Sequence, residues 1–276
     1  MDSAFHSLHQ RLQDSTVSYA RDKLGDTTIS QFTPWLCFLP LVPRINPRLI
    51  RYTPPVRGGL VTDDEVIGVM AAFLAADGKT AIIELPGDPQ VWLPATHHNS
   101  KTIDGALRVI RTSDRTMWQL YDLMVEYVVP LGGGRNRGYS THLIRGAIFR
   151  SLPEDNDEYD VAIDIMHEVG HQVLQVWQSV DPILTTDPNA PVFSQIRQTD
   201  RPAIQSFHAA VALGYMRYLQ RSLPDDPGMQ AAAGRRGASY SRILSYSLEL
   251  AIESLRDNCQ FTDVGEVMLR EMEAVI

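Results

Sequence analysis

The pattern of apolar and polar residues along the 276-residue chain predicts many helices and a few short strands. Residues 3–24 carry apolar side chains at helical spacing among charged ones, which is typical of an amphipathic helix. The same periodicity, with capping residues and prolines at its limits, predicts further helices over residues 62–76, 115–129, 158–180, 202–222, 239–256 and 264–274. Short apolar runs between turn residues predict strands at residues 80–85, 91–93 and 146–153. We therefore expect an α+β fold, mainly helical and of one domain, with a small sheet preceding the helix at residues 158–180.

A proline-rich segment follows the first predicted helix. Six prolines occur between residues 32 and 59, and they exclude a helix there because proline lacks the backbone N–H and clashes with the preceding turn. We interpret this segment as extended chain that wraps around the body of the protein. The sequence thus divides into residues 1–60, an N-terminal helix and wrapping segment, and residues 61–276, which carry the chemistry. Residues 181–200 contain further prolines and are expected to form a loop.

Composition narrows the class of protein. The chain is 44% hydrophobic and 21% charged, which is ordinary for a globular domain. Its net charge of −8 argues against nucleic acid or an anionic membrane as a partner. The two cysteines, Cys37 and Cys259, are interpreted as reduced, partly buried residues. Neither an apolar N-terminal segment nor a run of about 18 apolar residues occurs, so we expect no signal peptide, no membrane span and a cytoplasmic location.

The chemistry is concentrated in the predicted helix at residues 158–180, where His167, Glu168 and His171 form an H-E-x-x-H motif. Four residues on a helix turn through about 400°, so both histidines project from one face at a distance suited to a single metal ion. Glu168 lies beside them, where it can reach a metal-bound water as a general base. Asp164, one turn earlier, is either an acceptor for a histidine ring N–H or a charge near the helix start.

The same helix has two distinct faces. An apolar stripe predicts that the helix is buried, and it consists of Ala162, Met166, Val169, Val173 and Val176. A polar stripe consists of Asp164, His167, Glu168, His171 and Gln175. Polar side chains on a buried helix need partners, and a metal ion supplies them. Gly170 leaves one side of the helix open.

Two histidines do not hold a catalytic metal, so a third donor is required. His208 is the first candidate because it lies in an otherwise apolar predicted helix, one loop beyond the motif, and shares a face with Arg201 two turns earlier. Glu249, Glu253 and His142 are the alternatives.

The two glutamates have a simpler interpretation, since Arg242 and Arg256 share their helix face and would form a solvated ladder of ion pairs with them. The remaining histidines are expected at the surface, either on the first helix or in a loop: His6, His9, His97 and His98.

The combination of motifs resembles the α-ketoglutarate-dependent HExxH-type β-hydroxylases of peptides and amino acids. After the H-E-x-x-H helix the chain carries an R-x-x-x-R-P-x-x-x-x-x-H block, and the resemblance covers about residues 140–222. The matching residues are His167, Glu168, His171, Arg197, Arg201, Pro202 and His208. The resemblance implies an iron(II) enzyme that consumes 2-oxoglutarate and oxygen and hydroxylates the β-carbon of an amino acid, free or carrier-bound, or of a peptide residue, in a biosynthetic pathway.

A 2-oxoglutarate enzyme needs a cation for the distal carboxylate of its co-substrate, and arginine is the usual choice because it binds carboxylates in a bidentate manner. Arg201 and Arg197 are the candidates. With His167, His171 and His208 as iron ligands and Glu168 as the catalytic carboxylate, residues 61–276 are then a metal-dependent catalytic domain.

Two other functions compete with this interpretation. The first is a zinc metallopeptidase in which Glu168 is the general base and His142 or Tyr139 assists the oxyanion. The second is a non-enzymatic module with a structural metal, which is disfavoured because structural zinc is usually closed by cysteines or by four protein ligands.

Overall fold

The computed structural model describes residues 14, 17, 18, 21, 59–60, 97–125, 127–131, 138–141, 144–151, 156–180, 182–194, 197–223, 225–235 and 240–276. The helix predicted at residues 62–76 and the strands predicted at residues 80–85 and 91–93 lie outside these ranges. So do most of residues 1–60, although residues 14, 17, 18 and 21 are helical. The proposed division of the chain at residue 60 therefore stays a prediction.

A four-stranded sheet precedes the motif helix in the sequence. It consists of β1 (Gly59–Leu60), β2 (Tyr127–Leu131), β3 (Gly138–Thr141) and β4 (Ile144–Ser151), in the order β1-β2-β4-β3. The first three strands of this order are parallel, and β3 pairs antiparallel with β4 at one side. The strand predicted at residues 146–153 is thus confirmed within two residues.

The helix predicted at residues 115–129 is shorter than expected. Helix α6 (Arg115–Met124) begins as predicted after Asp114, whose carboxylate accepts hydrogen bonds from the backbone N–H groups of Thr116 and Met117. It ends at Met124, and the following YVVPL segment forms β2 instead. Tyrosine and valine favour strands. Here they belong to β2, which lies between β1 and β4 in the sheet, so strand pairing overrides the helical periodicity of this segment.

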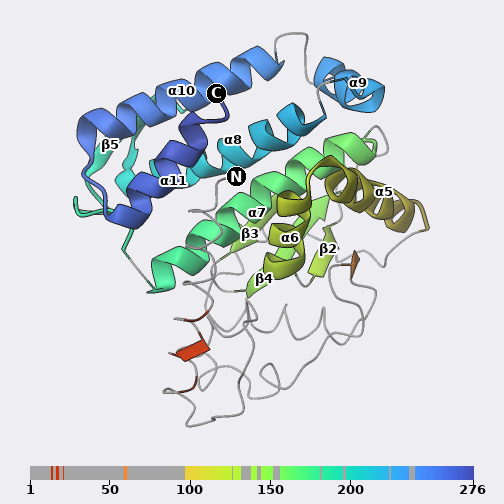
Figure 1. Ribbon diagram of the computed structural model, residues 1–276, viewed down its shortest axis with the longest axis horizontal. Helices are drawn as coiled ribbons and strands as arrows, with labels where there is room; N and C mark the ends of the chain where they lie inside the picture. Colours follow the sequence, from red (N-terminus) through yellow and green to blue (C-terminus); the bar gives the residue numbers. More distant parts are fainter. Residues whose placement is uncertain are drawn as a thin grey trace.

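Helix α7 (Glu158–Val180) has the predicted bounds and lies at the centre of the described structure. It contacts α5 (His97–Ser113), α6 and α8 (Ala203–Ser222) as well as β3 and β4 of the sheet (Figure 1). His97 and His98 begin α5 rather than standing in a loop, which corrects the prediction for that segment.

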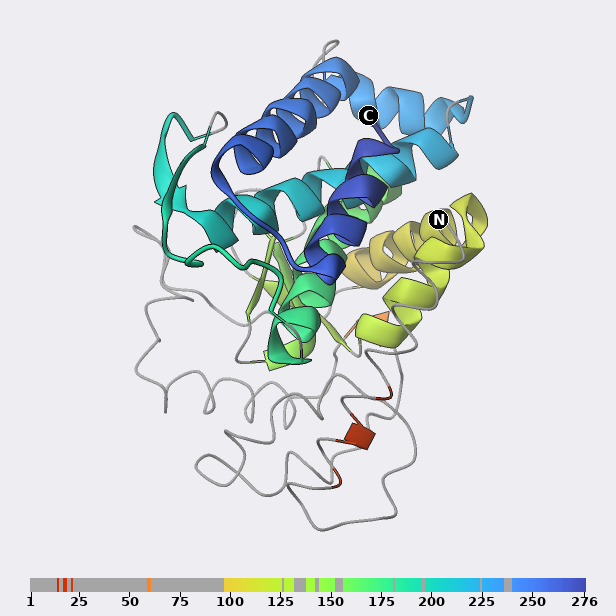
Figure 2. The same ribbon diagram turned by 60° about the vertical axis from the view of Figure 1, so that its left-hand side comes forward.

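The region predicted as a loop, residues 181–200, contains a β-hairpin. Its strands are β5 (Pro191–Ser194) and β6 (Thr199–Pro202), and the turn between them includes Gln198 in the left-handed region with a φ of 53°. Prolines occupy the outer ends of both strands, where they are tolerated. Figure 2 shows this hairpin beside the start of α8.

Three more helices complete the described structure. Helix α9 (Pro227–Arg235) is additional to the predicted helices, whereas α10 (Tyr240–Asn258) and α11 (Asp263–Glu273) match the two C-terminal predictions closely. Both α10 and α11 pack against α8 (Figure 1). The chain is therefore an α+β protein that is mainly helical.

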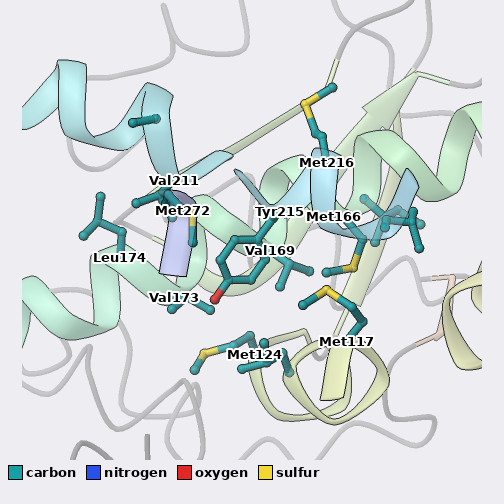
Figure 3. Close-up of a cluster of buried hydrophobic side chains, with 14 of the residues drawn as sticks. Met117, Met124, Met166, Val169, Val173, Leu174, Val211, Tyr215, Met216 and Met272 are labelled. Carbon is teal, nitrogen blue, oxygen red and sulfur yellow. The ribbon is translucent and has the colours of Figure 1, made fainter. Parts of the chain in front are cut away.

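The core is formed between α5, α6, α7, α8, α10 and α11. Four of the five residues of the predicted apolar stripe of α7 are fully buried, namely Ala162, Met166, Val169 and Val173. Figure 3 shows this cluster, which is rich in methionine and surrounds Tyr215 of α8: Met117, Met124, Met166, Met216 and Met272. Cys259 is buried as well, as predicted; Cys37 lies outside the described residues.

Helices α7 and α8 approach each other closely at Gly170. A Cβ atom at this position would lie 3.1 Å from the Cα atom of Ala212 and 3.3 Å from the carbonyl oxygen of Val211. Both neighbouring atoms belong to helix backbone, which cannot rotate away as a side chain does. Gly170 therefore sets the distance between the helix that carries the H-E-x-x-H motif and the helix that carries His208.

We expect Gly170→Ala to destabilise the protein although alanine favours helices. Overpacking of this kind costs about 1–3 kcal/mol, whereas replacing glycine by alanine within a helix contributes about 0.5–1 kcal/mol. The expected net loss of unfolding free energy is about 1 kcal/mol, measured by urea denaturation. A variant more stable than wild type would show that the two helices are not in tight contact at this position.

Candidate metal centre

Three histidine side chains meet where α7 and α8 cross. His167 and His171 project from α7, and their Nε2 atoms are 3.2 Å apart. His208 projects from α8, and its Nδ1 atom lies 3.3 Å from Nδ1 of His171. The ring centroids are separated by 4.8 Å for the first pair and 5.4 Å for the second. The three histidines that the sequence singled out therefore lie in one cluster.

The spacing of the motif histidines fits a shared metal ion. Two nitrogen ligands bound at about 2.1 Å and at about 90–110° to one another lie about 3.0–3.4 Å apart, and the observed separation is 3.2 Å. Burial, and then the electrostatic interactions with His167 and Arg201, lower the pKa of His171 to about 3. His171 is therefore neutral, which is the form of imidazole that binds a metal.

The cluster is not arranged around a single point. His171 faces His167 with Nε2 but faces His208 with Nδ1, which is on the other edge of the same ring. Within the described residues, accordingly, no three His, Cys, Asp or Glu side chains are arranged to bind one metal ion. Binding by all three histidines requires a rotation of the His171 or the His208 ring.

The outer nitrogens of two of these rings contact neutral acceptors. Nδ1 of His167 lies 3.1 Å from the Sδ atom of Met216 on α8. Nε2 of His208 lies 3.1 Å from Oε1 of Gln178, which lies two turns after His171 on α7. Contacts of this kind orient the histidine ligands of metal sites. Neither Met216 nor Gln178 was among the residues expected at the site. Gln178 continues the polar stripe of α7, so helical periodicity could have found it, but Met216 resembles any other core methionine.

Glu168, the carboxylate of the motif, is buried against the sheet. It is 3% exposed, and burial raises its pKa to about 7, against a smaller opposing effect of Ser140 on β3. Its Oε2 atom has no hydrogen-bond partner within the described structure. A carboxyl group of this pKa exchanges a proton near neutral pH, and its unsatisfied oxygen can accept a hydrogen bond from a water or a substrate.

Asp164 pairs with the sheet, and its role as an acceptor for a histidine ring N–H stays a prediction. It lies in the second turn of α7, past the helix start, and forms an ion pair with Arg150 of β4. Arg150 is 2% exposed, so this pair anchors α7 to the sheet in a buried setting. The charges of Asp164 and Arg150 act in opposite directions on the pKa of Glu168. Sequence periodicity could not reveal Arg150, since it lies on a different element.

The alternative third ligands differ in where they lie. Glu249 and Glu253 are exposed on α10. Their predicted ladder with Arg256 is wrong, because Arg256 instead forms ion pairs with Glu266 and Glu273 of α11. His142 lies outside the described residues, and Tyr139 is on β3. Among the described alternatives, His208 alone contacts the motif.

The two candidate arginines also differ. Arg201 is on β6, so the prediction that it shares a helix face with His208 is wrong, and the helix begins only at Ala203. It is half-buried, donates to Gln205 of α8, and its charge is one of the causes of the lowered pKa of His171. Arg197 lies in the hairpin turn with its side chain exposed.

Comparison with known proteins adds no assignment: no family model matches the chain, and no curated protein matches its sequence. The described helices include none that is both long and apolar enough to cross a membrane. The candidate centre therefore rests on the geometry of its own residues.

We expect His208→Ala to lose bound metal while keeping its fold, as His167→Ala and His171→Ala should. A half-buried histidine contributes little packing, whereas removal of a ligand opens the coordination sphere. Metal content by atomic spectroscopy and the far-ultraviolet circular dichroism spectrum measure the two effects. Wild-type metal stoichiometry in His208→Ala would refute the assignment and return attention to His142.

Proposed function

We propose that the protein is a non-haem iron(II), 2-oxoglutarate-dependent oxygenase. It hydroxylates the β-carbon of an amino acid, free or carrier-bound, or of a peptide residue, in a biosynthetic pathway. The observation that carries this proposal is the contact of His208 with the H-E-x-x-H pair, at a position where the charge of Arg201 also acts on His171. Three histidine donors and a nearby cation are what binding of a metal and a dicarboxylate requires.

His167, His171 and His208 would hold the iron. Bound iron(II) with open positions supplies the activation of oxygen and binds the keto-acid end of 2-oxoglutarate. Three imidazoles in place of the common two histidines and one carboxylate keep the ligand set neutral. Glu168, in this proposal, is the catalytic carboxylate: it is buried, directly follows His167 in the motif, and has an oxygen left to orient a water or substrate group.

Arg201 would bind the distal carboxylate of 2-oxoglutarate. Its strand ends where α8 begins, so the hairpin and the helix together fix its guanidinium relative to His208. The start of α8 is itself tied down, because the backbone N–H groups of Ala203 and Ile204 donate to carbonyl oxygens at Ala190 and Pro188. Arg197 lacks this anchoring and is exposed.

One observation favours a zinc metallopeptidase as the second candidate. A glutamate with a pKa of about 7 beside two histidines suits the general base that activates a zinc-bound water. The downstream glutamates considered as a third zinc ligand, Glu249 and Glu253, are exposed on α10, however, which removes the support for a His-His-Glu site of this kind.

We expect turnover to require iron(II), oxygen and 2-oxoglutarate. The measurement is succinate release by anaerobically purified protein reconstituted with iron(II) or with zinc(II), in the presence of a panel of amino acids and peptides. His171→Ala is the control, since it removes a motif ligand. Hydrolysis of a peptide by the zinc form without any keto acid would overturn the oxygenase and establish the peptidase.

We expect Arg201→Ala to raise the 2-oxoglutarate concentration needed for half-maximal turnover more than tenfold, with metal content unchanged. Loss of a partly buried partner of a carboxylate costs about 2–5 kcal/mol, which corresponds to at least that factor. Arg197→Ala is the matched control, because it removes the same charge from the same hairpin. The opposite result, with only Arg197→Ala affected, would show that the wrong arginine has been assigned.

A further inference from the structure

Opposite nitrogens of the His167 ring face His171 and Met216. Nε2 faces His171 at 3.2 Å, on the side where the motif would hold a metal. Nδ1 faces the thioether sulfur of Met216 at 3.1 Å. Met216 is buried, at 7% exposure, and lies on α8 two turns after His208 (Figure 3).

The chemistry of the thioether decides which nitrogen of His167 carries the proton. A thioether sulfur has lone pairs and no hydrogen to donate, so it can only accept. Nδ1 of His167 must therefore donate. A neutral imidazole carries one N–H, and with the proton on Nδ1 the lone pair remains on Nε2, the nitrogen that faces His171.

We propose that Met216 is a positioning residue of the metal centre, whose sulfur holds His167 in the tautomer and orientation that present Nε2 to the metal. The inference rests on the metal-binding part of the proposed function and is independent of the reaction catalysed. Helix α8 then has two tasks. It brings His208 to His171, and it supplies the acceptor that orients His167. One helix therefore positions both His208 and His167.

Ordinary core packing is the competing explanation for Met216. It belongs to the methionine-rich cluster around Tyr215, and a methionine there needs no role beyond filling space. The two explanations differ in which substitution at Met216 should restore metal affinity. Leucine replaces the volume of methionine without an acceptor, whereas glutamine restores an acceptor at a similar length of side chain.

The test uses zinc(II) as a diamagnetic probe of the full-length protein. Affinity is measured by competition with a chelator for wild type, Met216→Leu, Met216→Gln and Met124→Leu. The last is the matched control, because Met124 is a buried methionine of the same cluster but lies on α6. Histidine tautomers in the zinc-loaded wild type are assigned from long-range proton–nitrogen correlation spectra, with His167→Ala identifying the signals of His167.

We expect Met216→Leu to bind zinc about tenfold or more weakly, as loss of an outer hydrogen bond to a ligand does in other sites. Met216→Gln should recover most of that loss, and Met124→Leu should match wild type. The spectra of wild type should show His167 protonated at Nδ1 and bound through Nε2.

The proposal is overturned if Met216→Leu binds zinc as tightly as wild type, if both leucine variants are weakened equally, if Met216→Gln fails to recover affinity, or if the zinc-loaded His167 is bound through Nδ1. Wild-type protein that binds no zinc would overturn it too. Failure of the oxygenase proposal is separate: a protein that shows the expected order of zinc affinities but releases no succinate with iron(II) keeps the role of Met216 and loses the reaction.

Discussion

The close approach of α7 and α8 at Gly170 is the constraint on which the candidate site depends. Each helix alone carries an incomplete set of donors: two motif histidines on α7 and His208 on α8. A contact of 3.3 Å between His171 and His208 is possible because no side chain at Gly170 holds the helix backbones apart. The fold brings donors 37 residues apart in the sequence within contact distance. A metal can then add its binding free energy to a packing that already exists.

The carboxylate of the motif lies against the sheet. Ser140 of β3 lies against Glu168, and Arg150 of β4 forms a buried ion pair with Asp164 of α7. Burying these groups is costly unless they are paired, so the ion pair both fixes the register of α7 on the sheet and offsets that cost. One oxygen of Glu168 nevertheless has no hydrogen-bond partner within the described structure. A buried oxygen without a hydrogen bond lowers the stability of the fold, and proteins retain such unfavourable groups mainly at functional sites.

These two contacts separate the functional interpretations. The α7–α8 contact contributes a third histidine and the neighbouring charge of Arg201, which suit a metal and a dicarboxylate. The contact of α7 with the sheet contributes a carboxyl group of near-neutral pKa, which a peptidase and an oxygenase could both use. The hairpin β5–β6 favours the oxygenase over the peptidase, because it holds Arg201 at the start of the helix that carries His208.

The sequence by itself determined the elements whose signals are local. The bounds of α7, the start of α6 and the positions of α10 and α11 follow from periodicity and capping within a few neighbouring residues. It also determined that His167, Glu168 and His171 share a helix, because four residues span about one turn.

Tertiary structure decided what depends on residues far apart in the chain. The YVVPL segment is a strand because β4 pairs with it. Asp164 binds Arg150 and His167 contacts Met216, and neither partner carries a signal in the sequence. Periodicity describes how one element faces the core, whereas the partner opposite each polar group depends on how two elements cross, and that is settled only when both are packed.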